Sequence, residues 1–260
     1  MRYIKSLKVF CYAAVALLLS SILLPISCDA ATVWSDDFND GNYNSWTLYG
    51  LNFSTFTPTT ATGEFSAADN TLKATSADPI CSYAVHSSSV AYGTWSFDLN
   101  VVDNPFHYSL VFFIAGDMSI IPTMDYAYSI IVCTDAVPTT TTVPAILLAK
   151  HGPTPGSEII GRYEPPDGVS GWQKIVVTRS TSGLFTVYVN DTAQISIEDT
   201  THTTSVDFCF GSESGPAIDN VVVSNTIDYP ATDFTVIILF GVVVIAVVVI
   251  LVIYFIRFRR

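Results

Sequence analysis

The two ends of the chain are almost purely apolar, and the region between them alternates apolar and polar residues. Residues 236–256 contain no charged side chain and are mostly Val, Ile and Leu. At about 1.5 Å per residue, a helix of this length spans the roughly 30 Å hydrocarbon core of a bilayer. Arg257, Arg259 and Arg260 follow directly. The positive-inside bias therefore predicts one transmembrane helix, 236–256, a cytoplasmic tail, 257–260, and an extracellular N-terminal domain, as in a single-pass type I cell-membrane protein.

The N-terminal segment has the pattern of a secretory signal peptide. Three basic residues within the first eight precede an apolar run, and small residues follow near position 30. Residues 1–30 are therefore predicted to be removed on secretion. Lipidation of Cys28 is the alternative at this end. At the other end, residues 229–233 partly resemble a sortase sorting signal, which is the alternative to an ordinary juxtamembrane linker.

Between these ends the pattern is typical of β-strands. Residues 94–101 alternate strictly, which places Trp95 and Phe97 together on a buried face. Residues 185–190 and 206–210 repeat the same alternation. No window of comparable length has the periodicity of an amphipathic helix.

Two runs, 108–115 and 127–132, are apolar on both faces and are predicted to be central strands buried between layers. Clusters of Gly, Pro, Asn, Asp and Ser separate about ten to thirteen strands in all. The predicted fold class is all-β. We expect an antiparallel two-sheet sandwich, or jelly roll, over residues 32–224, followed by a juxtamembrane linker, 225–235.

The charge of the chain excludes one class of partner. The 11 Lys and Arg residues are outnumbered by 23 Asp and Glu residues, for a formal net charge of −12. The ends are basic, so residues 32–235 contain 5 basic and 22 acidic side chains, a net charge of −17. Nucleic-acid binding requires a basic surface that releases counterions. No nucleic acid is therefore expected as a partner.

Residues 34–41 with Trp46, residues 171–191 and residues 215–223 form three distinctive segments. They resemble the opening strand and turn, a Trp-containing hairpin and the closing strand of the concanavalin A-like lectin/glucanase superfamily, which includes laminin G-like and pentraxin domains. The resemblance implies a concanavalin A-like sandwich over nearly the whole of residues 33–224, in which the last strand pairs beside the first. The superfamily contains lectins, glycosidases and adhesion modules, so the fold does not select among them.

The sequence lacks the catalytic motif expected of a glycosidase with this fold. Retaining glycosidases of this fold place Glu-x-Asp-x-x-Glu on one strand, which aims both carboxylates at the same sugar. That motif is absent, and the four histidines are isolated, without a nucleophile-elbow glycine pattern. The predicted function is a membrane-anchored, noncatalytic extracellular module that binds carbohydrate of the cell surface or envelope. The alternatives are a structural or adhesive protein with protein partners, and an atypical glycoside hydrolase.

Tyrosine can stack on a sugar while its hydroxyl stays in water. Trp172 is expected to anchor its strand in the core instead. Five tyrosines, which are better candidates for exposure than the core aromatics, are the candidate ligand contacts: Tyr43, Tyr49, Tyr126, Tyr128 and Tyr163.

Calcium is the predicted ion, because carboxylates are its preferred ligands and the resemblance implies that the first and last strands pair. Each of the candidate residues also fits an ordinary turn. The candidate ligands of a structural Ca²⁺ are Asp36, Asp37, Asp40 and Asp219.

Two further sets of residues suggest covalent modification. Asn52 and Asn190 begin N-glycosylation triplets, although Asn190 also lies where a hairpin would turn. Cys81, Cys133 and Cys209 remain after removal of the signal peptide. This odd number allows one disulfide among them, or three buried thiols.

Overall fold

The computed structural model describes the middle of the chain, within the unit Ala31–Arg260. The predicted signal peptide, transmembrane helix and cytoplasmic tail lie outside the described residues, as do the last eight residues of the predicted linker. In the part that is described, no helix is long and apolar enough to cross a membrane. The described residues are 31–52, 57–59, 65–75, 80–101, 108–119, 126–134, 144–152, 157–212 and 215–227.

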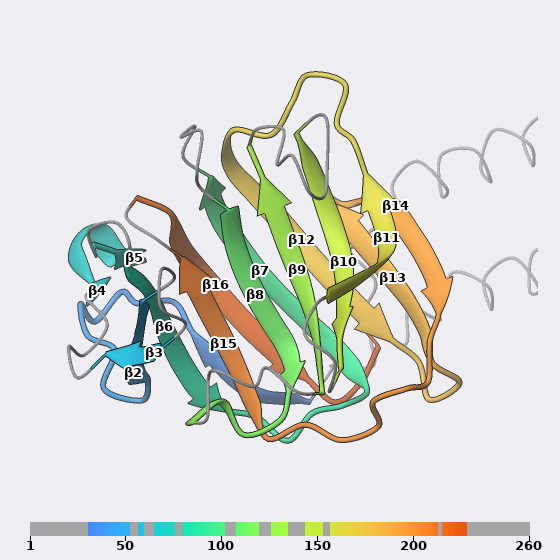
Figure 1. Ribbon diagram of the computed structural model, residues 1–260, viewed down its shortest axis with the longest axis horizontal. Coiled ribbons are helices and arrows are strands. Elements are labelled where there is room, and N and C mark those ends of the chain that lie inside the picture. Colours follow the sequence, from blue (N-terminus) through green and yellow to red (C-terminus); the bar gives the residue numbers. More distant parts are fainter. Residues whose placement is uncertain are drawn as a thin grey trace, which may run out of the picture. The chain divides into compact units, whose positions relative to one another are not determined.

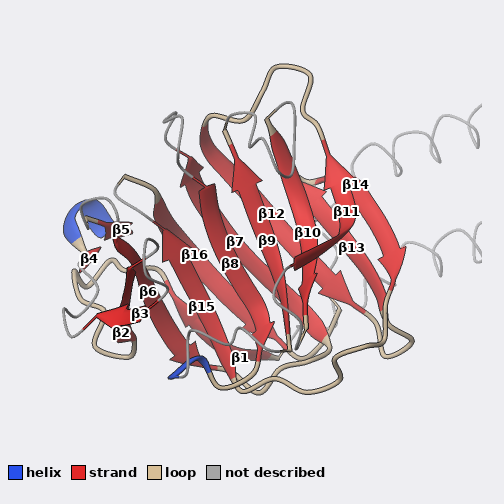
Figure 2. Ribbon diagram, in the orientation of Figure 1, coloured by secondary structure: helices blue, strands red, loops and turns tan. Residues whose placement is uncertain are grey.

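Two antiparallel sheets of eight strands each overlie one another in the described residues (Figures 1 and 2). Sheet A has the order β14 (Thr192–Glu198), β13 (Leu184–Val189), β12 (Gly171–Arg179), β7 (Gly93–Val101), β16 (Ala217–Ser224), β5 (Leu72–Ala74) and β4 (Phe65–Ser66), with β1 (Thr32–Asp36) also paired to β16. Sheet B has the order β11 (Ser157–Tyr163), β10 (Ala145–His151), β9 (Ala127–Cys133), β8 (Tyr108–Ala115), β15 (Asp207–Ser212), β6 (Ile80–Ser87), β2 (Thr47–Asn52) and β3 (Thr57–Thr59).

The predicted antiparallel two-sheet sandwich is therefore confirmed. The strands outnumber the ten to thirteen expected because several, such as β4 and β5, are only two or three residues long. Runs this short show too little alternation to be recognised in a sequence. A 3-10 turn, η1 (Ala68–Asn70), lies between β4 and β5.

Alternation along the strands builds the main core between the sheets. Every second residue of β7, from Trp95 to Val101, is buried in this core, and Phe185 and Val187 of β13 pack into it from the same sheet. Phe208 and Phe210 of β15 enter it from sheet B. The predicted inward faces of these three strands are thus confirmed. Val206 is the exception, since it precedes β15 and is exposed.

The central strands β8 and β9 of sheet B are buried on both faces, as predicted. Val111 and Phe113 of β8 point into the main core, whereas Leu110 and Phe112 belong to a second apolar cluster on the opposite face. Near-continuous apolar sequence is what burial on two sides requires.

The first and last described strands lie side by side. β1 pairs with β16, with Asp36 opposite Val221 and Trp34 opposite Val223. This pairing is the one that the resemblance implied. It brings the loop after β1 close to residues near Asp219, which are more than 180 positions away along the chain.

Candidate functional site

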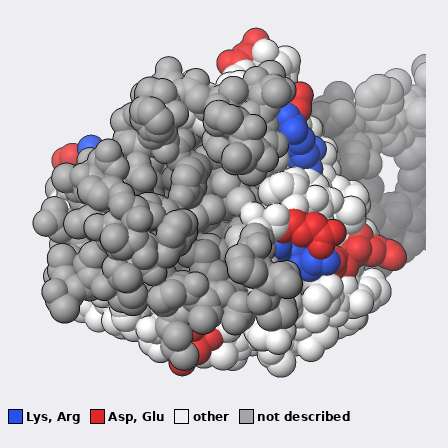
Figure 3. Space-filling model, in the orientation of Figure 1, with Lys and Arg blue, Asp and Glu red and all other residues white. Residues whose placement is uncertain are grey.

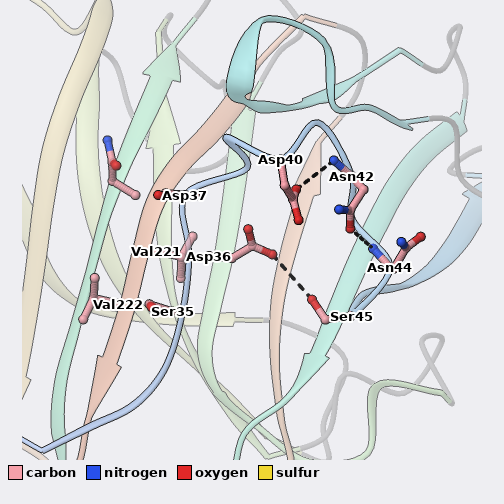
Figure 4. A pocket seen from close by; sticks show the side chains of 10 residues that line it. Ser35, Asp36, Asp37, Asp40, Asn42, Asn44, Ser45, Val221 and Val222 are labelled. Atoms are coloured by element: carbon pink, nitrogen blue, oxygen red, sulfur yellow. Dashed lines mark hydrogen bonds between the residues drawn. The ribbon is translucent and has the colours of Figure 1, made fainter.

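A pocket of about 690 Å³ opens beside the β1–β16 edge (Figure 4). The end of β1 and the loop that follows it form one wall, and β16 forms the other. Apart from two valines, the lining is polar: Ser35, Asp36, Asp37, Asp40, Asn42, Asn44, Ser45, Asn220, Val221 and Val222.

The loop holds its own polar side chains in place. Asp36 accepts hydrogen bonds from the Phe38 amide (3.0 Å) and from the Trp46 indole nitrogen (2.8 Å). The Asn42 amide donates to Asp40 over 3.0 Å, and the Asn44 amide donates to the Asn42 side-chain oxygen over 3.1 Å. Short Asp and Asn side chains favour such turns because they bond to the backbone two residues on. The carboxylates that line the pocket are therefore positioned before any ligand arrives.

A second group of carboxylates adjoins the pocket on the outer face of sheet A, the face turned away from the main core. Asp98 of β7 lies opposite Asp219 of β16 in the sheet register. A bulge follows Asp219, and Asn220 there adopts a φ of 50°. Its side-chain nitrogen donates to Asp98 (2.9 Å) and to Asp219 (3.2 Å). Burial, together with the charges of Asp98, Asp37 and Asp36, raises the pKa of Asp219.

The four predicted calcium ligands thus lie in one region, but they do not form a ready-made metal site. Asp36, Asp37 and Asp40 line the pocket, and Asp219 precedes Asn220 on its other wall. Over the described ranges, no three His, Cys, Asp or Glu side chains converge on a point where a metal ion would sit. One oxygen of each loop carboxylate already accepts a backbone amide. Calcium stays a prediction that would need the remaining oxygens and loop carbonyls to rearrange.

Trp172 lies on the outer face of sheet A, which corrects the prediction that it anchors the core. Its side chain is 47% exposed. Ile175 and Val177 of β12 point inward, so alternation along the strand puts Trp172 with Lys174 on the outside. Trp172 pairs with Asn100 of β7, two residues along from Asp98. We call the residues that run from the indole to the pocket the Trp172 strip: Trp172, Asn100, Asp98 and Asn220.

The predicted ligand tyrosines do not gather in one place. Tyr126 is exposed, whereas Tyr128 is fully buried in the main core and is not available to a ligand in this conformation. Tyr43 and Tyr163 pack partly against the main core, and Tyr49 packs against the second cluster. The sequence analysis did not identify Trp172 as a ligand contact. Its position was predictable, because alternation along the strand places Trp172 on the same face as the polar Lys174 and opposite to Ile175.

The structure describes one of the two candidate glycosylation sites fully and all three cysteines. Asn190 is an exposed residue of the β13–β14 turn, and its side chain bonds to Lys174 and Gln173. Its φ of 49° fits the turn asparagine that the sequence allowed. Asn52 ends β2, and its side chain lies outside what is described. The three cysteines are buried and are thiols rather than a disulfide: Cys81, Cys133 and Cys209.

No protein-family model matches the chain, and no curated protein matches its sequence. Among solved structures, the laminarinase catalytic domain of Thermotoga maritima MSB8 is similar, with 13% identity, a TM-score of 0.55, and coverage of 77% of this chain and 100% of that chain. The carbohydrate recognition domain of Emp47p has 11% identity, a TM-score of 0.51, and coverage of 77% and 100%. A Bacillus subtilis protein of unknown function with a galectin-like fold has 12% identity, a TM-score of 0.54, and coverage of 75% and 96%.

These likenesses, at identities far below those of close relatives, concern the fold alone. The described domain is a concanavalin A-like, or galectin-like, β-sandwich, as the sequence resemblance implied.

Proposed function

We propose that this protein is a noncatalytic carbohydrate-binding domain, and that the Trp172 strip with the adjoining pocket is its glycan surface. The observation that carries the proposal is the half-exposed indole of Trp172, set on an open sheet beside fixed amide and carboxylate groups. The fold likeness to a carbohydrate recognition domain supports the same class of ligand. As predicted from the sequence, we place the domain outside the cell, held by the transmembrane segment 236–256.

The chemistry of the strip suits a sugar chain. Aromatic rings pack on the flat C–H faces of sugars, and hydroxyl groups take amide and carboxylate partners. Strands β12, β7 and β16 are neighbours. Two interstrand spacings of about 4.8 Å separate Trp172 from the strand of Asn220. Asn220 also lies three residues along β16 from Ala217, the residue in register with Asn100 and Trp172. A chain running diagonally over the strands would therefore reach from the indole to Asn220 over about 14 Å.

The charge of the surface narrows the class of glycan. Asp36, Asp37, Asp98 and Asp219 interact electrostatically, and their mutual repulsion contributes to the raised pKa of Asp219. An anionic glycan would add more negative charge to this region. We therefore expect neutral glycans to bind and uronic-acid or sulfated glycans to be rejected.

A glycan array followed by calorimetry tests the proposal. Trp172→Ala should weaken binding of the best neutral oligosaccharide at least tenfold, because loss of one stacking contact is worth about 1.5 kcal/mol. Leu184→Ala is the matched control, since Leu184 is also an exposed apolar side chain on the outer face of sheet A but lies at the other end of β13 from the strip. Its Kd should stay within twofold. Unchanged binding by the Trp172 variant would reject this surface.

One observation favours a second candidate, an atypical glycoside hydrolase. Asp98 and Asp219 are opposite each other on neighbouring strands, where Cβ atoms lie about 5 Å apart. A carboxyl group with a raised pKa beside a second carboxyl group is the arrangement of an acid and a nucleophile. Products released from the bound oligosaccharide by the wild type and not by Asp219→Asn would establish this activity. Self-association without any glycan binding would favour the adhesive alternative.

A further inference from the structure

A network of buried polar groups lies at one end of the sandwich, away from the Trp172 strip. Its centre is the segment that crosses from β14 in sheet A to β15 in sheet B, the orange loop in Figure 1. We call residues 199–205 the strap. Although the strap has no regular secondary structure, His202 and Ser205 within it are buried. Its backbone must therefore be held by side chains of other elements.

Arg179 of β12 is the first of these. Its guanidinium donates hydrogen bonds to the carbonyl oxygens of His202 (2.6 Å), Asp199 (3.0 Å) and Ala91 (3.1 Å). The side chain is fully buried and also lies over aromatic rings, including those of Tyr128 and Phe185. Arg179 thus ties the strap to sheet A.

The Asp199 carboxylate ties the strap to sheet B. It accepts hydrogen bonds from the Tyr128 hydroxyl of β9 and from Lys150 of β10, the latter over 3.0 Å. The Tyr128 oxygen in turn accepts the His202 amide at 3.2 Å. Lys150 also pairs with Glu158 over 2.9 Å. Figure 3 shows acidic and basic side chains adjoining one another on the part of this face where Figure 1 places β10, β11 and β14.

Two histidines complete the attachment. The His202 Nε2–H donates to the carbonyl oxygen of His151 over 2.7 Å. The His151 ring nitrogen Nε2 lies 2.8 Å from the Ser129 hydroxyl, and its ring packs on Phe112. Both imidazoles are buried. In the part of the chain that is described, neither has a carboxylate within ion-pair distance.

We propose that His151 and His202 make the strap acid-sensitive: neutral, they hold it against β9 and β10, and protonated, they release it. A charged imidazole here would be buried, and the one carboxylate that favours the charged form of His202, that of Asp199, already accepts hydrogen bonds from Tyr128 and Lys150. It would also add positive charge near Arg179 and Lys150, of which only Lys150 pairs directly with the Asp199 carboxylate. The ionisable groups that face the two rings from the surrounding elements are Tyr128, Lys150, Glu158, Arg179, Asp199 and Tyr126.

The sign of the pH effect follows from burial. Burial, reinforced by the neighbouring His202, lowers the pKa of His151 to about 4, and burial lowers that of His202 as well. A released, solvated imidazole has a pKa of about 6.5. Between pH 6.5 and about 4, the form with the strap released therefore binds more protons than the attached form. The free energy that favours attachment decreases as the pH falls through this range. For His151 alone, the difference between these two pKa values corresponds to at most about a 300-fold change in the attachment equilibrium, and to roughly 60-fold between pH 7.0 and 4.5.

Release would have a consequence at the surface. Tyr126 and the buried Tyr128 contact the His202 ring, with centroid distances of 5.5 and 5.0 Å. Detachment of the strap removes the partner of the Tyr128 hydroxyl and uncovers this end of the core. Acid would thus expose an aromatic surface that is closed at neutral pH, independently of any glycan bound at the Trp172 strip.

Hydrogen–deuterium exchange of the purified protein at pH 7.0 and 4.5, corrected for intrinsic rates, tests the proposal. Amides of the strap and of β9 and β10 should lose at least tenfold protection at pH 4.5, while those of β7, β12 and β13 keep theirs. The double variant His151→Gln, His202→Gln should remove this difference, because an uncharged amide does not titrate. His86→Gln is the matched control, since His86 stacks on Trp34 away from the strap, and it should respond as the wild type does.

Two results would overturn the proposal. One is equal protection of the strap at both pH values in the wild type, a measurement that stands even where the double variant does not fold. The other is a double variant that retains the wild-type pH response. Glycan binding at pH 7.0 is unaffected by either result, so the proposed function and the acid-sensitive strap fail separately.

Discussion

Arg179 shows how the interior of this sandwich accommodates a charged residue without a direct ion pair. Its two terminal nitrogens donate to three backbone carbonyls, and three aromatic rings surround the guanidinium at 4.7 to 5.0 Å. Burial lowers the pKa of Arg179, opposed by Tyr128, Tyr92 and Asp199. An arginine is far from deprotonation at any physiological pH. The side chain therefore acts as a permanently charged clamp on segments from three parts of the chain.

The hydrogen bonds of Arg179 predict that lysine at this position would give a much less stable protein than arginine. Arg179→Lys keeps the charge but loses the planar fork, which leaves buried carbonyl oxygens without donors. We expect a loss of about 3 kcal/mol in the free energy of unfolding, measured by urea denaturation at pH 7. Arg162→Lys is the control, because its ion pair with Glu164 is partly exposed, and it should change stability by less than about 0.5 kcal/mol. Similar effects of the two substitutions would contradict a clamping role.

Strand β7 depends on a glycine where it begins. Gly93 has a φ of 141°, and a Cβ atom placed there would lie 2.0 Å from the carbonyl oxygen of Ser224 in β16. No side chain fits at that distance from a backbone atom. The close approach lets Thr94 pair with Ser224 and aligns the central strands of sheet A. A backbone position of this kind is conformationally restricted to glycine.

We therefore expect Gly93→Ala to be among the most damaging single substitutions in the domain. It combines a disfavoured φ with a backbone collision, so the loss should exceed about 3 kcal/mol or prevent folding altogether. Gly152→Ala provides the contrast, since a Cβ there meets no atom within 4 Å and the backbone is compatible with alanine. That control should be neutral or slightly stabilising. Thermal denaturation of both variants is the measurement, and an unaffected Gly93 variant would mean that β7 and β16 are not in this register.

Strand periodicity was enough to predict the core but not the contacts between distant strands. The inward faces of β7 and β13 follow from alternation within a few residues. Tyr128 was predicted to be exposed but is buried. Because β9 is apolar on both faces, alternation along the strand does not distinguish the face toward the main core from the opposite face. The pair of Asp98 with Asp219 and the partners of Arg179 depend on register and on loop conformation. Neither of these is encoded in local pattern.

At the scale of the whole molecule, the many acidic side chains of the domain repel one another, and few basic residues are present to offset this repulsion. Residues 32–235 contain 22 acidic and 5 basic side chains. Like charges destabilise a compact state and are screened by salt. This repulsion is visible at the pocket and its neighbours, because three other carboxylates help to raise the pKa of Asp219, and at Asp207, where Asp117 contributes. A cation bound in the pocket would relieve the larger of these two groups of carboxylates.

Screening and a specific calcium site make different predictions for thermal stability. Screening alone gives the same Tm in 1 mM CaCl₂ as in 1 mM MgCl₂. The calcium site predicted from the sequence requires a rise of several degrees with Ca²⁺ only, because Ca²⁺ accepts the irregular oxygen set of a loop and Mg²⁺ demands a regular octahedron. The Ca²⁺-specific rise should disappear with EGTA and in Asp40→Asn, which removes a pocket carboxylate. Equal Tm values with the two cations would contradict a specific calcium site. The pocket carboxylates would then have only the proposed role of hydrogen-bonding a glycan.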